Sequence, residues 1–209
     1  MATIVNIRGT SGSGKTTAVR YVMKKLGVVS NIVSSKSKAP GASTRYRLQY
    51  GKRVVGYRLS GGVLVVGRYE TACGGCDGIK TQEEIVERVK KFAYMGEVVL
   101  FEGLTLGTIY TRYYELSALL KKSGHRFIWA FLDTPIDVCI KRVLKRRRLA
   151  GNTKPFNTKH TEAKFRSINS AKQHAITDKE RVMTLNGKCA GKQLLKRIEN
   201  MLHKDFKIG

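Results

Sequence analysis

Four residues near the amino end have the types and the spacing of a phosphate-binding loop. Gly9, Gly14, Lys15 and Thr16 fit the pattern G-x-x-x-x-G-K-[ST] in the segment GTSGSGKT. In such a loop the backbone N–H groups turn toward phosphates, the lysine reaches the terminal phosphates and the hydroxyl ligates Mg²⁺. We therefore expect a bound nucleoside triphosphate with Mg²⁺. The residues expected to contact it are Gly9, Ser11, Gly12, Ser13, Gly14, Lys15, Thr16 and Thr17.

Two further groups of residues could act on a bound triphosphate. Glu102 ends the apolar segment 98–101, where an acidic residue beside a phosphate loop would hold Mg²⁺ together with Thr16. Arg142 and Arg146 are one helical turn apart, so both could clamp phosphate groups as charge shifts during transfer. The alternatives are a surface glutamate at a strand end and a solvated basic helix.

The elements that would position these residues alternate along the chain. Apolar and β-branched runs predict strands at 3–8, 63–67, 98–102, 127–132 and 181–185. Helical spacing and stop signals predict helices at 16–26, 81–95, 109–122, 136–149 and 193–202. This alternation predicts an α/β domain with a parallel sheet and helices on both faces.

The segment 30–62 departs from this alternation. Serines, Pro40 and Gly41 indicate a loop, and the runs at 46–49 and 54–59 flank a turn. We expect an inserted basic antiparallel hairpin that leads into the strand at 63–67. Its arginines and tyrosines could grip nucleic acid, and a soluble edge hairpin is an equal alternative.

The segments GTSGSGKT, VVLFEG and FLDTPIDVCIKRVLKRRR together resemble the P-loop kinases related to nucleoside monophosphate kinases and polynucleotide kinases. The resemblance spans much of residues 3–148 and leaves 30–62 outside the common core. It implies a P-loop NTPase three-layer sandwich around a five-stranded parallel sheet in the order 2-3-1-4-5, with ATP and Mg²⁺ as cofactors. The helix with Arg142 and Arg146 would lead into a lid at 142–160, within one domain of residues 1–209.

The resemblance also implies an acidic base for the acceptor hydroxyl, just beyond the second core strand. Glu70 and Asp77 both follow Val66, and either carboxylate could take the proton of that hydroxyl. We favour Asp77, because it lies between a Gly-Gly turn and the helix that begins near Thr81. The expected catalytic residues are Lys15, Asp77, Glu70, Arg142 and Arg146.

The charge of the chain bears on the identity of the acceptor. Among 209 residues, Lys and Arg number 40 and Asp and Glu number 15, which gives a formal net charge of +25. The range 141–172 holds eleven basic residues and Glu162 as its single acid. Such an excess favours a polyanion, whereas a small-nucleotide kinase needs only a local cationic pocket. We predict DNA, or another polynucleotide, as the acceptor, and no membrane partner.

These observations predict a kinase that moves the γ-phosphate of ATP to a hydroxyl of DNA. The compact chain, its basicity and the lack of an attached phosphatase or ligase domain are similar to phage 5-hydroxymethyluracil DNA kinases. That similarity implies the 5-hydroxymethyl group of the base as the acceptor. The alternatives are a nucleoside or nucleotide monophosphate kinase, a 5′-hydroxyl polynucleotide kinase and a nucleic-acid-binding ATPase without a phosphoacceptor. The oligomeric state stays open.

Cys73 and Cys76 form a C-G-G-C pair without a second pair close by. We interpret the segment as a tight glycine turn with incidental thiols, in preference to a zinc or redox site. The chain also lacks a run of about 18 apolar residues and begins with strand-like residues in place of a signal peptide. We expect a cytoplasmic protein, in the host cytoplasm if a phage encodes it.

Overall fold

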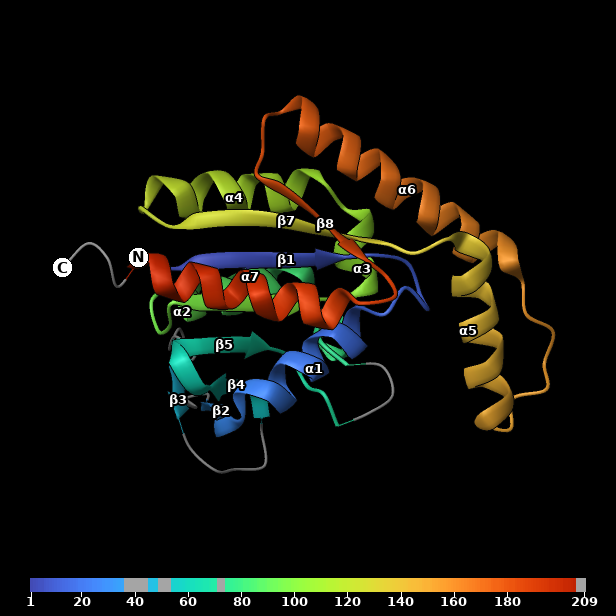
Figure 1. Ribbon diagram of the computed structural model, residues 1–209, viewed down its shortest axis with the longest axis horizontal. Helices are drawn as coiled ribbons and strands as arrows, with labels where there is room; N and C mark the ends of the chain where they lie inside the picture. Colours follow the sequence, from blue (N-terminus) through green and yellow to red (C-terminus); the bar gives the residue numbers. More distant parts are fainter. Residues whose placement is uncertain (36–44, 49–53, 71–73, 206–209) are drawn as a thin grey trace, which may run out of the picture.

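The computed structural model describes residues 1–35, 45–48, 54–70 and 74–205. A mixed sheet of eight strands forms its centre, in the order β3-β2-β4-β5-β6-β1-β7-β8 (Figure 1). The strands are β1 (Thr3–Arg8), β2 (Val28–Ser35), β3 (Arg45–Leu48), β4 (Val54–Leu59), β5 (Val63–Val66), β6 (Val98–Glu102), β7 (Arg126–Asp133) and β8 (Val182–Asn186).

Five of these strands are parallel and carry the predicted topology. They follow one another as β5-β6-β1-β7-β8, which is 2-3-1-4-5 when only these strands are counted. The prediction is wrong for the sheet as a whole, because three antiparallel strands extend it beyond β5. Every residue of β1, β5 and β6 is buried, as expected for strands that helices cover on both faces.

The segment 30–62 does not form the predicted hairpin. β3 and β4 do not pair with each other; both pair antiparallel with β2, which lies between them. Ser34 and Ser35 therefore belong to a strand, although they indicated the start of a loop. The physical reason is that a strand between two partners gains ladder hydrogen bonds on both edges and buries Ile32, which outweighs the weak strand preference of serine. The predicted turn at 50–52 lies outside the described residues.

Helices cover both faces of the sheet. α1 and α7 pack on one face, where Val19, Val22, Leu194 and Ile198 join the core. α2 and α4 pack on the other face, where Val89, Phe92 and Leu116 join a second core cluster. The helices are α1 (Lys15–Leu26), α2 (Gln82–Ala93), α3 (Leu104–Thr108), α4 (Thr111–Lys122), α5 (Ile136–Leu149), α6 (Thr158–Thr177) and α7 (Ala190–Asp205).

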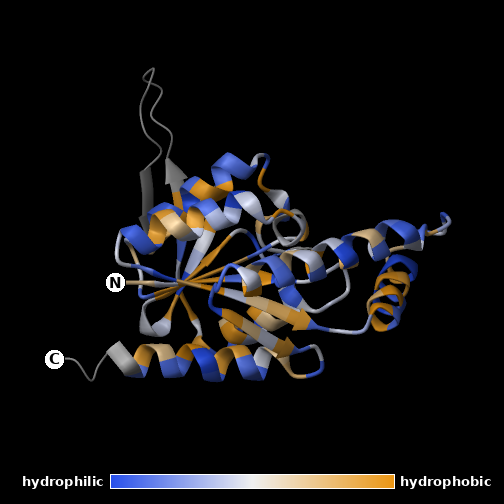
Figure 2. Ribbon diagram, turned by 90° about the horizontal axis from the view of Figure 1, so that it is seen from above, coloured by the Kyte–Doolittle hydropathy of each residue, from blue (hydrophilic) through white to orange (hydrophobic). Residues whose placement is uncertain are grey.

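α5, the linker 150–157 and α6 form a helical arm that projects from one end of the sheet (Figures 1 and 2). α6 was not predicted, although its buried Ile168, Ala171 and Ala175 have helical spacing. The predicted lid at 142–160 covers the second half of α5, the linker and the start of α6. No helix in the described part of the chain has the length and apolarity needed to cross a bilayer.

Candidate active site

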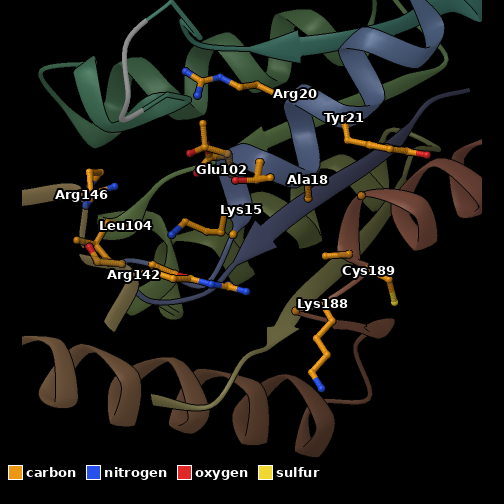
Figure 3. A pocket seen from close by; sticks show the side chains of 18 of the residues that line it. Lys15, Ala18, Arg20, Tyr21, Glu102, Leu104, Arg142, Arg146, Lys188 and Cys189 are labelled. Atoms are coloured by element: carbon orange, nitrogen blue, oxygen red, sulfur yellow. The ribbon is translucent and has the colours of Figure 1, made fainter. Parts of the chain in front are cut away.

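A cavity of about 650 Å³ opens beside the loop that joins β1 to α1, at the carboxyl ends of the parallel strands. Ligands of open α/β sheets bind at this edge, because the βα loops and helix N-termini converge there. Figure 3 shows Lys15, Glu102 and Arg142 pointing into this space, with Arg146 beside them. The predicted site residues that line it are Ser11, Gly12, Gly14, Lys15, Thr16, Thr17, Asp77, Glu102, Arg142 and Arg146.

The loop takes a shape that only glycine permits at two positions. Gly12 and Gly14 have φ angles of +80° and +104°, and a side chain at Gly12 would collide with the backbone carbonyl of Cys139. Gly9 and Ser13 do not line the cavity and form the base of the loop, where a side chain on Gly9 would meet the Ser13 hydroxyl. α1 then begins at Lys15 without a side-chain cap, so its first N–H groups suit an anion.

Lys15 lies inside this loop and is only 7% exposed. Its Nζ donates to the carbonyl oxygens of Gly9, at 2.7 Å, and Thr10, at 3.2 Å. Burial lowers the pKa of the Lys15 ammonium, and the nearby Glu102 carboxyl opposes that shift. The loop therefore holds one cation among backbone dipoles at the base of the cavity.

The buried Glu102 and the half-buried Thr16 form a pair beside Lys15. The Thr16 hydroxyl donates to Glu102 Oε1 at 2.8 Å. Glu102 Oε2 is buried and has no hydrogen-bond partner among the described residues. Burial raises the pKa of the Glu102 carboxyl to about 7, while Lys15 and Thr16 pull it down. An orphaned carboxylate oxygen beside a hydroxyl fits a hard divalent cation such as Mg²⁺, which prefers oxygen ligands.

We expect Glu102→Gln to raise the free energy of unfolding at pH 8 and to leave it nearly unchanged near pH 4.5. Between pH 4.5 and about 7, the unfolded chain loses a proton that the folded carboxyl keeps, so wild-type stability falls relative to the variant. The full difference is on the order of 3 kcal/mol. Urea unfolding of both proteins without Mg²⁺ or nucleotide measures it. A variant less stable than wild type at pH 8 would contradict a buried carboxylate whose ionisation costs stability.

The Gly-Gly turn of the C-G-G-C segment packs directly on the Thr16–Glu102 pair. A Cβ on Gly74 would lie 2.9 Å from Thr16 Cγ2, and one on Gly75 would lie 2.7 Å from Glu102 Cδ. Glycine at both positions thus lets the chain pass against the pair. The turn brings Asp77 into the cavity, where its Oδ1 accepts from the Leu104 backbone N–H at 2.6 Å.

Of the two cysteines of this segment, the structure describes Cys76. Cys76 is buried, with its Sγ 4.0 Å from the Val66 carbonyl oxygen. Cys73 lies outside the described residues. No group of His, Cys, Asp and Glu side chains suited to a metal occurs in the part of the chain that the structure describes.

Glu70, the second candidate for the base, does not line the cavity. The backbones of Arg68 and Gly75 pair through hydrogen bonds of 3.2 and 2.8 Å, so Glu70 lies beyond the point where the chain leaves the sheet. Its carboxylate accepts from the Tyr57 hydroxyl and is 3.6 Å from Arg68 Nε. The structure therefore places the Glu70 carboxylate outside the cavity that the other expected catalytic residues line.

The base of α5 rests on the phosphate-binding loop. Arg142 donates to the carbonyl oxygens of Gly12, at 3.2 Å, and Ser13, at 3.4 Å. The buried Thr134 hydroxyl also donates to the Ser13 carbonyl, at 2.9 Å. The D-T-P turn before α5 thus holds the loop from one side and places Arg142 and Arg146 along the cavity wall.

Sequence reasoning missed the opposite wall of the cavity. It consists of Arg20 and Tyr21 from α1 and of residues 187–192, which follow β8. Gly191 packs so closely on the Tyr21 ring that a Cβ there would lie 2.7 Å from Tyr21 Cβ. Their position in the sequence could have indicated this role. Residues 187–192 follow the last parallel strand, and ligands of such sheets bind at the carboxyl ends of the strands.

Arg8 was also missed, because it looked like the polar end of a strand. Its side chain is fully buried; it donates to the Ile109 carbonyl at 3.0 Å and lies 4.2 Å from the centre of the Trp129 ring. Burial lowers the pKa of the Arg8 guanidinium to about 9. Arg8 links β1 to the end of α3, whose first N–H group, that of Leu104, binds Asp77.

A family model and the curated relatives share one description. A family model described as 5-hmdU DNA kinase matches residues 1–194. The 5-hmdU DNA kinase of Pseudomonas phage PaMx11 is 34% identical over 168 residues, which cover 78% of this chain and 79% of that protein. That of Pseudomonas phage M6 is 32% identical over 207 residues, 94% of this chain and 98% of that protein. A solved structure from the PezAT toxin–antitoxin system of Streptococcus pneumoniae has a TM-score of 0.48 and 15% identity, covering 89% of this chain and 68% of that one.

Proposed function

This chain belongs to the 5-hmdU DNA kinase family, and on that premise we propose that it transfers the γ-phosphate of ATP to the 5-hydroxymethyl group of 5-hydroxymethyluracil in DNA. The observation that carries the proposal is one cavity lined by a phosphate-loop lysine, a buried acid, an exposed acid and two arginines. Phosphoryl transfer needs little covalent chemistry from a protein. It needs positioned cations around the phosphates and a base for the acceptor, and the cavity contains both kinds of group.

In this proposal the loop and its cations bind the triphosphate. Lys15 exchanges the Gly9 and Thr10 carbonyls for phosphate oxygens, and the N–H groups at the start of α1 face the same phosphates. Arg142 and Arg146 approach from the other side. The wall formed by Tyr21 and residues 187–192 would flank the nucleoside part of ATP.

Thr16 and Glu102 would hold Mg²⁺, which neutralises phosphate charge and orients the γ-phosphate when bound. Two observations support this assignment: Glu102 Oε2 lacks a hydrogen-bond partner among the described residues, and the Thr16 hydroxyl touches the same carboxylate. The Glu102 carboxyl must lose its proton to act as a ligand. Because burial raises its pKa to about 7 before Mg²⁺ binds, we propose that the affinity for Mg²⁺ falls as the pH is lowered through 7.

Asp77 would act as the base. The Leu104 N–H group occupies its Oδ1, so Oδ2 would accept the proton of the hydroxymethyl group. The freed oxygen then forms a bond to the γ-phosphorus while the bond from that phosphorus to the β–γ bridging oxygen breaks, and ADP leaves. Lys15, Arg142 and Arg146 stabilise the charge that develops on the leaving phosphate. A base in a duplex must leave the stack to reach Asp77, or the DNA must be unpaired.

A transfer assay with ATP labelled at the γ-phosphate tests this function. Two DNAs of identical sequence carry either 5-hydroxymethyluracil or thymine, and both carry 5′-phosphates so that no terminal 5′-hydroxyl competes. We expect label on the hydroxymethyluracil DNA and none on the thymine DNA. Label on added hydroxymethyl-dUMP alone, or released only as inorganic phosphate, would reject DNA as the acceptor. A parallel DNA with a 5′-hydroxyl and thymine tests the polynucleotide-kinase alternative.

A further inference from the structure

α5 has few contacts with the body of the protein for a helix of its length. Of its fourteen residues, only Cys139 and Val143 are buried. It nevertheless carries six basic residues and one acidic residue, Asp137. Figure 1 shows α5 at the end of the helical arm, away from the sheet, and Figure 2 shows the arm projecting from the body. A helix this basic and this exposed has a large surface available to a polyanion.

The cations of α5 form two stripes. The first consists of Arg142 and Arg146, which line the cavity. The second, which we call the outer stripe, consists of Lys141, Lys145 and Arg148, spaced i, i+4 and i+7 and all exposed. Because each residue turns a helix by about 100°, the outer stripe lies roughly a quarter-turn or more from the first, facing solvent. Its one acidic neighbour, Asp137, is 3.9 Å from Lys141 in an exposed pair of little strength.

The far end of α5 is braced against the linker. Arg147 donates to Asn152 Oδ1 at 3.0 Å and to the Lys154 carbonyl at 2.8 Å. Its guanidinium also lies 5.4 Å from the centre of the Phe156 ring. Arg147 is thus occupied in holding the corner between α5 and the linker, so the other cations are presented on a braced helix.

We propose that the outer stripe of α5 binds the phosphate backbone of the DNA acceptor, while Arg142 and Arg146 face the nucleotide. This inference rests on the proposed function, and it names the surface that holds the DNA. Lys141 and Arg148 are about 10 Å apart along the helix, the axial length of about three base pairs, so the stripe matches consecutive phosphates. The same arm borders the cavity, so a nucleotide extruded from DNA bound there would be close to Asp77.

One consequence is coupling between the two substrates. Because a single helix carries both stripes, DNA bound on the outside restrains Arg142 and Arg146 on the inside. DNA should therefore tighten ATP binding, and ATP should tighten DNA binding by the same factor. Without DNA, substitutions in the outer stripe should leave the affinity for ATP unchanged.

The test compares two doubly substituted proteins of equal charge. Lys145→Ala/Arg148→Ala removes two cations of the outer stripe, and Lys24→Ala/Lys122→Ala removes two exposed cations from α1 and α4. Fluorescence anisotropy measures the affinity for hydroxymethyluracil duplex DNA at several salt concentrations. We expect at least a tenfold loss for the outer-stripe variant and a log–log salt slope shallower by about 1.8, from two lost phosphate contacts. The control should stay within about twofold of wild type.

Further measurements separate a loss of DNA contacts from misfolding and from a change in ATP binding. Thermal melting checks that both variants fold, and ATP affinity measured without DNA should match wild type in both. Equal salt slopes for the two variants would overturn the proposal. A change in the sedimentation of the outer-stripe variant without a change in its DNA affinity would also overturn it, and would assign this face to a second copy of the chain. If the wild-type protein binds DNA but never phosphorylates it, the proposed function is wrong. The DNA affinities of the two variants then still test whether the outer stripe binds DNA.

Discussion

Lys15→Met is expected to lower the rate of phosphate transfer to DNA by about 10³-fold or more, because it removes a cation held at the base of the phosphate-binding loop. DNA binding should persist within about twofold, since Lys15 is buried in the loop and cannot contact a DNA backbone outside it. Single-turnover transfer from labelled ATP measures the first effect, and anisotropy measures the second.

The structure allows a folding control for this variant. Methionine has nearly the length of lysine without its charge, so the cost of burying an ammonium disappears while the Gly9 and Thr10 carbonyls lose a donor. We expect a melting temperature close to that of wild type. Lys24→Met, an exposed change on the same helix, should keep full activity. Equal loss of transfer and of DNA binding in Lys15→Met would argue that nucleotide and DNA share one site.

Asp77→Asn is expected to lower kcat by about 10²- to 10⁴-fold, the usual range for loss of a general base. The asparagine side-chain oxygen can still accept from the Leu104 N–H group, so the turn should keep its position. ATP affinity should change little. Rapid-quench measurement of a single turnover on hydroxymethyluracil DNA separates this chemical step from substrate binding.

Glu70→Gln is the matched control, because it makes the same change at the other acid that follows β5. The introduced amide oxygen can still accept from the Tyr57 hydroxyl, and Glu70 does not line the cavity. We expect a loss in kcat of less than about threefold, in line with a surface substitution. The reverse result, with Glu70→Gln inactive and Asp77→Asn active, would assign the role of base to Glu70.

The sequence was sufficient for several features that depend on neighbours in the chain, although the helical spacing within α6 was not recognised. GTSGSGKT predicted the phosphate-binding loop because its glycines and Lys15 act within one strand–loop–helix unit. The apolar runs predicted the five parallel strands, since strands buried on both faces are apolar throughout. The spacing of Arg142 and Arg146 predicted their common face, and the structure places both in the cavity.

Other features depend on residues far apart in the chain, and only the tertiary structure decided them. β2 lies between β3 and β4 through pairing that its own serines do not indicate. Which of Glu70 and Asp77 lines the cavity depends on the pairing of Arg68 with Gly75, and on Gly75 packing against Glu102. Residues 187–192 line the cavity because β8 and α7 position them, and Arg8 is buried because it packs against Trp129 and the end of α3. Spacing along the chain determines which residues lie on the same face of a helix or strand. The path of a loop and the burial of a charge depend instead on packing between segments that are distant in the sequence.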